Sequence, residues 1–313
     1  MSAISFDTDV STTGRGVNWQ ALTYPLTLEI PHFVIQRKML LGIKARAERA
    51  AGTDGAGQAR HRGDVARLRA SLERPGDGAL ERFSPDMVAD LPEPARRYFL
   101  HAIPTGTPLA RVARLEMTGE MRLGYDQRWL PMRARQVLAP PRGFVWEATV
   151  GMGLRRFAGA DSYADGQGRT EFRLWDVVPV VRAGGPDVSR SARGRLAIEA
   201  VWCPAALLPQ RGVTWTAVDD RTARASLTVD GEPIALTLIV EPDGRLRTAT
   251  IERWGNLTPD EQYTWIPFGV TVLDEHSADG YTVPGRVEAG WWFGTDRQLD
   301  FFRATVTRVA FLT

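Results

Sequence analysis

The chain is poor in the residues that build metal and disulfide sites. It has a single cysteine, Cys203, and four dispersed histidines: His32, His61, His101 and His276. One thiol excludes an intrachain disulfide framework and a cysteine-based zinc site. No histidine pair has the spacing of a helical metal-binding motif. The sequence therefore predicts no metal site.

An excess of one charge and long apolar runs are also missing. The formal net charge is only +2 over 313 residues, which argues against nucleic acid as a partner. No run reaches the roughly 20 apolar residues that span a bilayer. Residues 1–16 lack the basic start and apolar stretch of a signal peptide. We expect a cytoplasmic protein.

Familiar cofactor and nucleophile motifs do not occur. There is no Gly-x-Ser-x-Gly elbow and no phosphate-binding Gly-x-x-x-x-Gly-Lys. Gly151-Met152-Gly153 is not followed by a helix, so it indicates a strand end or bulge rather than a dinucleotide site. Cys203 has no identifiable histidine partner and is interpreted as a small buried side chain. We expect no cofactor.

The N-terminal third has helical patterns. Residues 31–50 and 63–74 are predicted helices separated by a glycine-rich break at 51–58, and residues 91–101 form a third, with prolines in its first turn. The basic region 31–74 could contact anionic lipid, but we favour packing of its apolar stripe on the body of the protein. We assign residues 1–102 to an N-terminal extension and helical arm.

From about Arg111 onward the pattern changes to period-two alternation. Roughly ten strands follow at hairpin spacing, with turns at Asp230-Gly231 and Pro242-Asp243-Gly244. The segment 170–181 is interpreted as one strand. Strands alternating with crossover helices are not seen. The predicted fold is α+β: a large curved antiparallel sheet, a barrel or half-barrel over residues 103–313, with N-terminal helices and one inserted helix.

The inserted helix is predicted over 187–203. Its arginine, alanine, leucine and glutamate content favours a helix, although a strand is the alternative, and Pro204 ends the run. Glu199 is a carboxylate in an otherwise apolar stretch, which is costly unless it is paired or protonated. Arg195 lies one helical turn earlier. We predict that Glu199 is buried and paired with an arginine, Arg195 being the first candidate.

Several segments resemble a bacterial family of unknown function whose members carry a Glu-x-x-Trp-x-Pro-x-x-Leu-Leu-Pro block, followed by Trp and paired Asp. The matching segments are GFVWEA, RLAIEAVWCPAALLP, WTAVDD, PFG and GYTVPGRVEAGWW, and the resemblance covers about residues 91–313. It implies a curved sheet similar to lipoprotein-carrier half-barrels, and it points to Glu199, Trp202, Pro204, Trp215, Asp219 and Asp220. Many relatives begin with membrane-spanning helices, whereas this chain has a basic, non-spanning N-terminal region.

Trp146 and Glu147 are neighbours on one predicted strand, so their side chains point to opposite faces of the sheet. If the face of Glu147 is concave, Glu147 joins Glu199 as a second carboxylate; otherwise Trp146 faces the cavity. A solvated strand residue is the alternative reading of Glu147. Asp219 and Asp220 are interpreted as a turn rather than a metal site.

The ten tryptophans have two readings. Ordinary packing in the core and on sheet faces accounts for most of them, and together they could also wall an aromatic cavity. The candidate ligand-binding residues are Trp146, Trp202, Trp215, Asp219 and Trp292, and the candidate catalytic residues are Glu199, Arg195 and Glu147.

Two functions remain open. One is binding of an apolar or aromatic small molecule in a sheet cavity. The other is a cofactor-independent enzyme, a cyclase, isomerase or lyase, that uses Glu199 as acid or base. The oligomeric state is not predicted.

Overall fold

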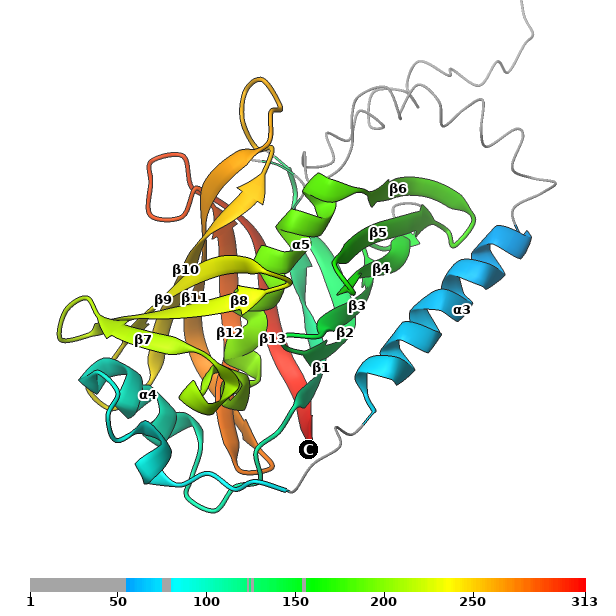
Figure 1. Cartoon of the computed structure of the whole chain (residues 1–313). Helices are drawn as coiled ribbons and strands as arrows, with labels where there is room; N and C mark the ends of the chain where they lie inside the picture. Colours follow the sequence, from blue (N-terminus) through cyan, green and yellow to red (C-terminus); the bar gives the residue numbers. More distant parts are fainter. Residues whose placement is uncertain (1–54, 75–79, 123, 125–126, 154–155) are drawn as a thin grey trace, which may run out of the picture.

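A computed structural model describes residues 55–74, 80–122, 124, 127–153 and 156–313 (Figure 1). Within these residues lie three α-helices, α3 (Gly55–Leu72), α4 (Glu93–Ala102) and α5 (Pro186–Glu199). Short 3-10 helices are η1 (Pro85–Val88), η3 (Ala200–Trp202), η4 (Pro204–Leu207) and η5 (Pro209–Arg211). No described helix is long and apolar enough to cross a membrane.

The described strands form one antiparallel sheet. They are β1 (Val112–Met121), β2 (Leu130–Ala139), β3 (Gly143–Val150), β4 (Phe157–Ala164), β5 (Gln167–Leu174), β6 (Val178–Gly184), β7 (Thr214–Ala217), β8 (Thr222–Val229), β9 (Glu232–Val240), β10 (Leu246–Gly255), β11 (Thr264–Ala278), β12 (Tyr281–Trp291) and β13 (Leu299–Leu312).

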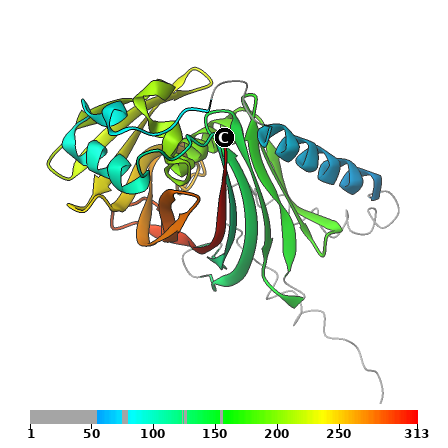
Figure 2. The ribbon, with the colours of Figure 1, turned by 90° about the horizontal axis from the view of Figure 1, so that it is seen from below.

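The order of these 13 strands explains the shape of the sheet. It runs β6-β5-β4-β3-β2-β1-β13-β12-β11-β10-β9-β8-β7. Two meanders, β1–β6 and β7–β13, meet where β1 pairs with β13. Because β6 and β7 are unpaired edges, the sheet is a curved half-barrel rather than a closed barrel (Figure 2). The predicted antiparallel α+β half-barrel is confirmed.

Helix α5 lies in the concavity and contacts strands of both arms, β4–β6 on one side and β8–β10 on the other. Gly185 (φ +100°) precedes it and Pro186 occupies its first turn. Gly168 allows the helix to come close, since a Cβ there would lie 2.8 Å from the Val188 carbonyl oxygen. The predicted inserted helix is confirmed, and η3 completes the expected range.

The hydrophobic core has two parts. The larger fills the concave side around α5 and extends under α4, which packs on β7–β9 and β12. The smaller lies on the convex side, where Val65 and Leu72 of α3 meet Val137 and Val145 of the sheet. Figure 2 shows α3 outside the strands, away from α5. Glu199 and Glu147 therefore face different environments.

Four expectations need comment. Helix α3 begins at Gly55, inside the predicted glycine-rich break. The expected strand 170–181 is a hairpin, because Trp175 and Asp176 form a two-residue turn with φ of +50° and +62°. That turn contains neither glycine nor asparagine, so the usual signal was missing. The predicted helix 31–50 lies outside the described residues, and the boundary at residue 102 stays a prediction.

Candidate functional site

A cavity of about 150 Å³ lies between α5 and the concave face of the sheet. Its walls are mostly aromatic and aliphatic side chains from both arms of the sheet, and its polar groups are few. The apolar lining consists of Met121, Trp146, Val150, Phe157, Phe172, Val181, Ile198, Trp202, Phe268, Val270, Val287, Ala289, Phe301 and Phe302; the polar lining consists of Asp161, Thr170, Arg195, Glu199 and Arg253.

A buried charge cluster forms one wall of this cavity. The Arg195 guanidinium donates from Nε to Glu199 Oε1 at 2.7 Å and from Nη1 to Asp161 Oδ2 at 2.6 Å. The three side chains are only 12–15% exposed. Gln136 Nε2 donates to Glu199 Oε2 at 2.6 Å, and Thr170 Oγ1 donates to Asp161 Oδ1 at 2.9 Å. Both carboxylates are thus held by two donors each.

Aromatic rings and charges set the state of Arg195. Its guanidinium lies 4.7 Å from the Phe144 ring centroid and 5.1 Å from that of Trp146, which is cation–π geometry. Burial acts to lower the pKa of Arg195, but Glu199 and Asp161 outweigh it and raise the pKa above its ordinary value. The cation is therefore permanent.

A second buried arginine faces the cluster from β10. Arg253 is 2% exposed, donates from Nε to the Ser191 carbonyl of α5 at 3.0 Å, and stacks over Phe268 and Trp291. Burial first, and then the Arg195 cation, lower the pKa of Arg253 to about 9. At neutral pH the polar wall thus holds two cations and two anions, so its formal charge is balanced.

Four of the sequence-predicted site residues meet at this cavity: Glu199, Arg195, Trp146 and Trp202. The predicted burial of Glu199 and its pairing with Arg195 are confirmed. Trp202 is anchored by donation from Nε1 to the Pro284 carbonyl at 2.8 Å. Trp146 faces inward because it shares the concave face of β3 with Phe144, which settles the alternation left open by the sequence.

Three predicted ligand-binding residues lie elsewhere. Trp215 is buried against Phe99 of α4 and donates to the Leu207 carbonyl. Asp219 caps the β7–β8 turn by accepting from the backbone N–H groups of residues 221 and 222. Trp292 has φ +54° just after β12 and donates to the Leu257 carbonyl. The cavity lining includes none of them.

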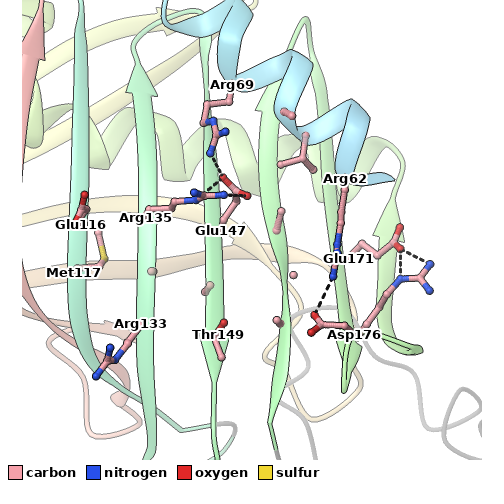
Figure 3. Close-up of a pocket in the computed structure, with 18 of the residues that line it drawn as sticks. Arg62, Arg69, Glu116, Met117, Arg133, Arg135, Glu147, Thr149, Glu171 and Asp176 are labelled. Atoms are coloured by element: carbon pink, nitrogen blue, oxygen red, sulfur yellow. Dashed lines mark hydrogen bonds and ion pairs between the residues drawn. The ribbon is translucent and has the colours of Figure 1, made fainter. Parts of the chain in front are cut away.

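Glu147 does not join Glu199, because it points to the convex face. There it accepts from Arg135 at 2.8 Å and from Arg69 of α3 at 2.9 Å (Figure 3). It lines a separate groove of about 810 Å³ between α3 and the sheet. Its ion pairs join α3 to β2 and β3. The alternative reading, that Glu147 lies on the face of the strand away from the cavity, is therefore the better one.

The convex groove is larger than the cavity but offers less to a ligand. Three of its carboxylates, Glu147, Glu171 and Asp176, each form ion pairs with arginines (Figure 3). Its floor consists of short side chains such as Ala158 and Ala160. Because three of its carboxylates are already paired and the apolar area is small, we consider the concave cavity the better candidate site.

Sequence reasoning missed Asp161, Thr170, Gln136 and Arg253. Gln136 and Arg253 left a local signal. Gln136 shares a strand face with the apolar Met132 and Leu138 in β2, and Arg253 shares one with Ala249 and Ile251 in β10. Asp161 lies on β4, a strand that was not predicted. Their convergence depends on the curvature of the sheet.

The cluster is suited to binding more than to metal or acid–base chemistry. Within the described residues, no group of three or more His, Cys, Asp or Glu side chains is placed to hold a metal ion. Both oxygens of Glu199 are occupied by donors. What remains accessible to a ligand is apolar surface beside a charge-balanced polar wall.

Two solved structures are similar to this chain. One is a LolA superfamily protein from Nitrosomonas europaea, with 9% sequence identity and a TM-score of 0.38; the match covers 70% of this chain and 92% of that protein. The other is a DUF1329 family protein from Desulfovibrio piger, with 9% sequence identity and a TM-score of 0.31; the match covers 64% of this chain and 86% of that protein. No curated protein matches. Residues 81–304 match the model described as a family of unknown function, DUF6544. The predicted resemblance to a family of unknown function is confirmed, and the chain belongs to this family.

Proposed function

We propose that this protein binds an uncharged apolar or aromatic small molecule in the cavity beneath α5. The observation that carries the proposal is the cavity itself, about 150 Å³ of space walled mainly by aromatic and aliphatic side chains in the middle of a close-packed core. Cores seldom leave voids of this size, because each lost contact destabilises the fold.

The volume limits the ligand. In another protein, an engineered cavity of about 150 Å³ with apolar walls binds benzene. A single ring or a short aliphatic segment thus fits here without movement of α5. A larger ligand requires its remaining part to lie toward the half-buried Met121, Phe157 and Phe301.

The polar wall sets selectivity. Arg195 and Arg253 balance Asp161 and Glu199, and hydrogen bonds from Arg195, Gln136 and Thr170 occupy both carboxylates. A charged ligand would lose its hydration and find no free counter-charge. A neutral ligand loses little water and gains contact with the rings.

The acid–base alternative has weaker support. A general base needs a free oxygen within reach of substrate, whereas Glu199 accepts from Arg195 on one oxygen and from Gln136 on the other. A binding protein should keep most of its affinity in Glu199→Gln, which preserves shape and can still accept a hydrogen bond.

The proposal is tested with a substitution that fills the cavity. Ala289 lines it, and Ala304 is a buried alanine of the adjacent strand that does not. We expect benzene and toluene to raise the melting temperature of the wild type by mass action, and Ala289→Leu to abolish that shift while folding normally. Ala304→Leu should lose about 1–3 kcal/mol from overpacking but keep the ligand-induced shift.

Native mass spectrometry of the purified protein would identify a retained ligand. If neither probe shifts the melting temperature, and Ala289→Leu is destabilised as much as Ala304→Leu, there is no usable cavity and the proposal fails.

A further inference from the structure

Three large apolar side chains protrude from two neighbouring strand connections. Met152 is 73% exposed between β3 and β4, and Trp175 and Val177 are 49% and 51% exposed at the β5–β6 turn. We call Met152, Trp175 and Val177 the tip surface. Exposed apolar side chains gathered in one place mark interaction sites more often than isolated ones do.

The backbone holds these side chains outward at some cost. Trp175 and Asp176 have φ of +50° and +62°, a conformation that tight turns normally give to glycine or asparagine. The turn is closed by Val177 N–H donating to the Leu174 carbonyl at 3.0 Å. Met152 lies between Gly151 and Gly153, whose φ values are +78° and +56°. A large side chain at a strained tip suggests a use for it.

Hydrogen bonds join the two connections into one surface. Trp175 N–H donates to the Arg156 carbonyl at 3.2 Å, and Arg156 N–H donates to the Gly153 carbonyl at 3.3 Å. The Arg156 side chain also pairs with Asp176 at 3.1 Å. Arg62 of α3 also pairs with Asp176, at 3.5 Å (Figure 3).

One of the two connections begins beside a strand residue that pairs with the cavity wall. Leu174, which precedes Trp175, is paired across the sheet with Phe157. Phe157 lines the cavity and stacks edge-on against Phe172, another lining residue. The β5–β6 turn therefore follows a strand end whose cross-strand partner, Phe157, lines the cavity.

We propose that the tip surface docks on the interface of a lipid bilayer. Tryptophan favours the boundary between headgroups and acyl chains. A protein partner normally needs about 800 Å² from each side, more than three side chains on two connections supply. Asp176 is matched by Arg62 and Arg156, so docking does not depend on anionic lipid. This inference goes beyond the ligand proposal and does not rest on it.

The first test places a probe at the tip. Met152→Cys is labelled with an environment-sensitive fluorophore, and Val218→Cys, whose native side chain is 53% exposed at the β7–β8 connection, is the matched control. Cys203 should not compete, because it is fully buried and burial raises the pKa of its thiol to about 12. With phosphatidylcholine vesicles, we expect a blue shift at position 152 and none at 218.

The second test removes apolar area from the full chain. We expect Trp175→Ser to weaken co-flotation with phosphatidylcholine vesicles about tenfold and Val177→Ser about threefold, from the area each loses. Val218→Ser should leave it unchanged. The proposal is overturned if all three serine variants bind vesicles equally, or if the label at position 152 shows no blue shift. It is also overturned if binding requires anionic lipid and is unaffected by the substitutions at Trp175 and Val177, which is the result expected for contact through residues 31–74.

Discussion

Arg195 is the residue whose loss tests the architecture of the candidate site most directly. In Arg195→Met the apolar stem remains, but Glu199 and Asp161 lose the cation that lies 2.7 and 2.6 Å away. Removing one partner of a buried ion pair costs about 3–5 kcal/mol, because a charge is left without compensation. Gln136 and Thr170 still donate to the two carboxylates, so we expect the lower end, about 3 kcal/mol.

Urea denaturation at neutral pH measures this loss, provided that the free energy of unfolding falls with urea concentration at the same slope in the variant and the wild type. Arg96→Met is the matched control. Arg96 pairs with Glu93 at 2.9 Å on the surface of α4, with 41% of its side chain exposed, and a screened pair of this kind contributes about 0.5 kcal/mol or less. Arg195→Lys keeps the charge but not the planar fork that reaches both carboxylates, so its loss should be intermediate.

A triple variant separates an orphaned charge from lost packing. If the cost of Arg195→Met comes from uncompensated carboxylates, adding Asp161→Asn and Glu199→Gln should recover part of the stability. A loss below about 1 kcal/mol for Arg195→Met, or a further drop in the triple variant, would refute the view that this cluster is a compensated buried network.

Two further predictions follow from other parts of the fold. Burial, the largest influence, raises the pKa of Tyr163 to about 12. Because the folded state keeps this proton to a higher pH than the unfolded state, the associated stability is present below pH 10 and is lost between pH 10 and 12. The stability of Tyr163→Phe should therefore decline less steeply in this alkaline range. If both proteins lose stability in parallel, Tyr163 does not titrate as described. Gly159→Ala would place a Cβ 2.0 Å from the Glu171 carbonyl oxygen, so we expect thermal denaturation to show a loss above about 2 kcal/mol, whereas Gly184→Ala, 3.6 Å from its nearest neighbour, should change stability by less than about 0.5 kcal/mol; equal effects would contradict the close strand approach at Gly159.

Much of the fold was readable from local patterns. Alternating polar and apolar residues identified most strands from Val112 to Leu312, and two Asp/Gly turns gave the antiparallel connection. The inserted helix followed from residue propensity and from Pro204. These features are local, since the period of a strand or helix is imposed by its own backbone geometry. The Trp175–Asp176 turn was missed because it lacks the residues that usually announce one.

The site was only half readable. Glu199 and Arg195 were found together because they lie one turn apart on one helix, so their distance is fixed by helix geometry. Asp161 and Thr170 join them from the neighbouring strands β4 and β5. Arg253 joins them from β10, which is far from both in the chain and in the strand order. No local pattern encodes that convergence.

The sequence by itself determined which side chains alternate along each strand, and that Glu199 needs a partner. Only the tertiary structure decided which face of each strand is concave. The direction in which the sheet curls, and the helix that fills the curl, set Trp146 toward the cavity and Glu147 toward α3. The physical reason is that alternation fixes two faces without assigning them, whereas burial against α5 assigns one to the core.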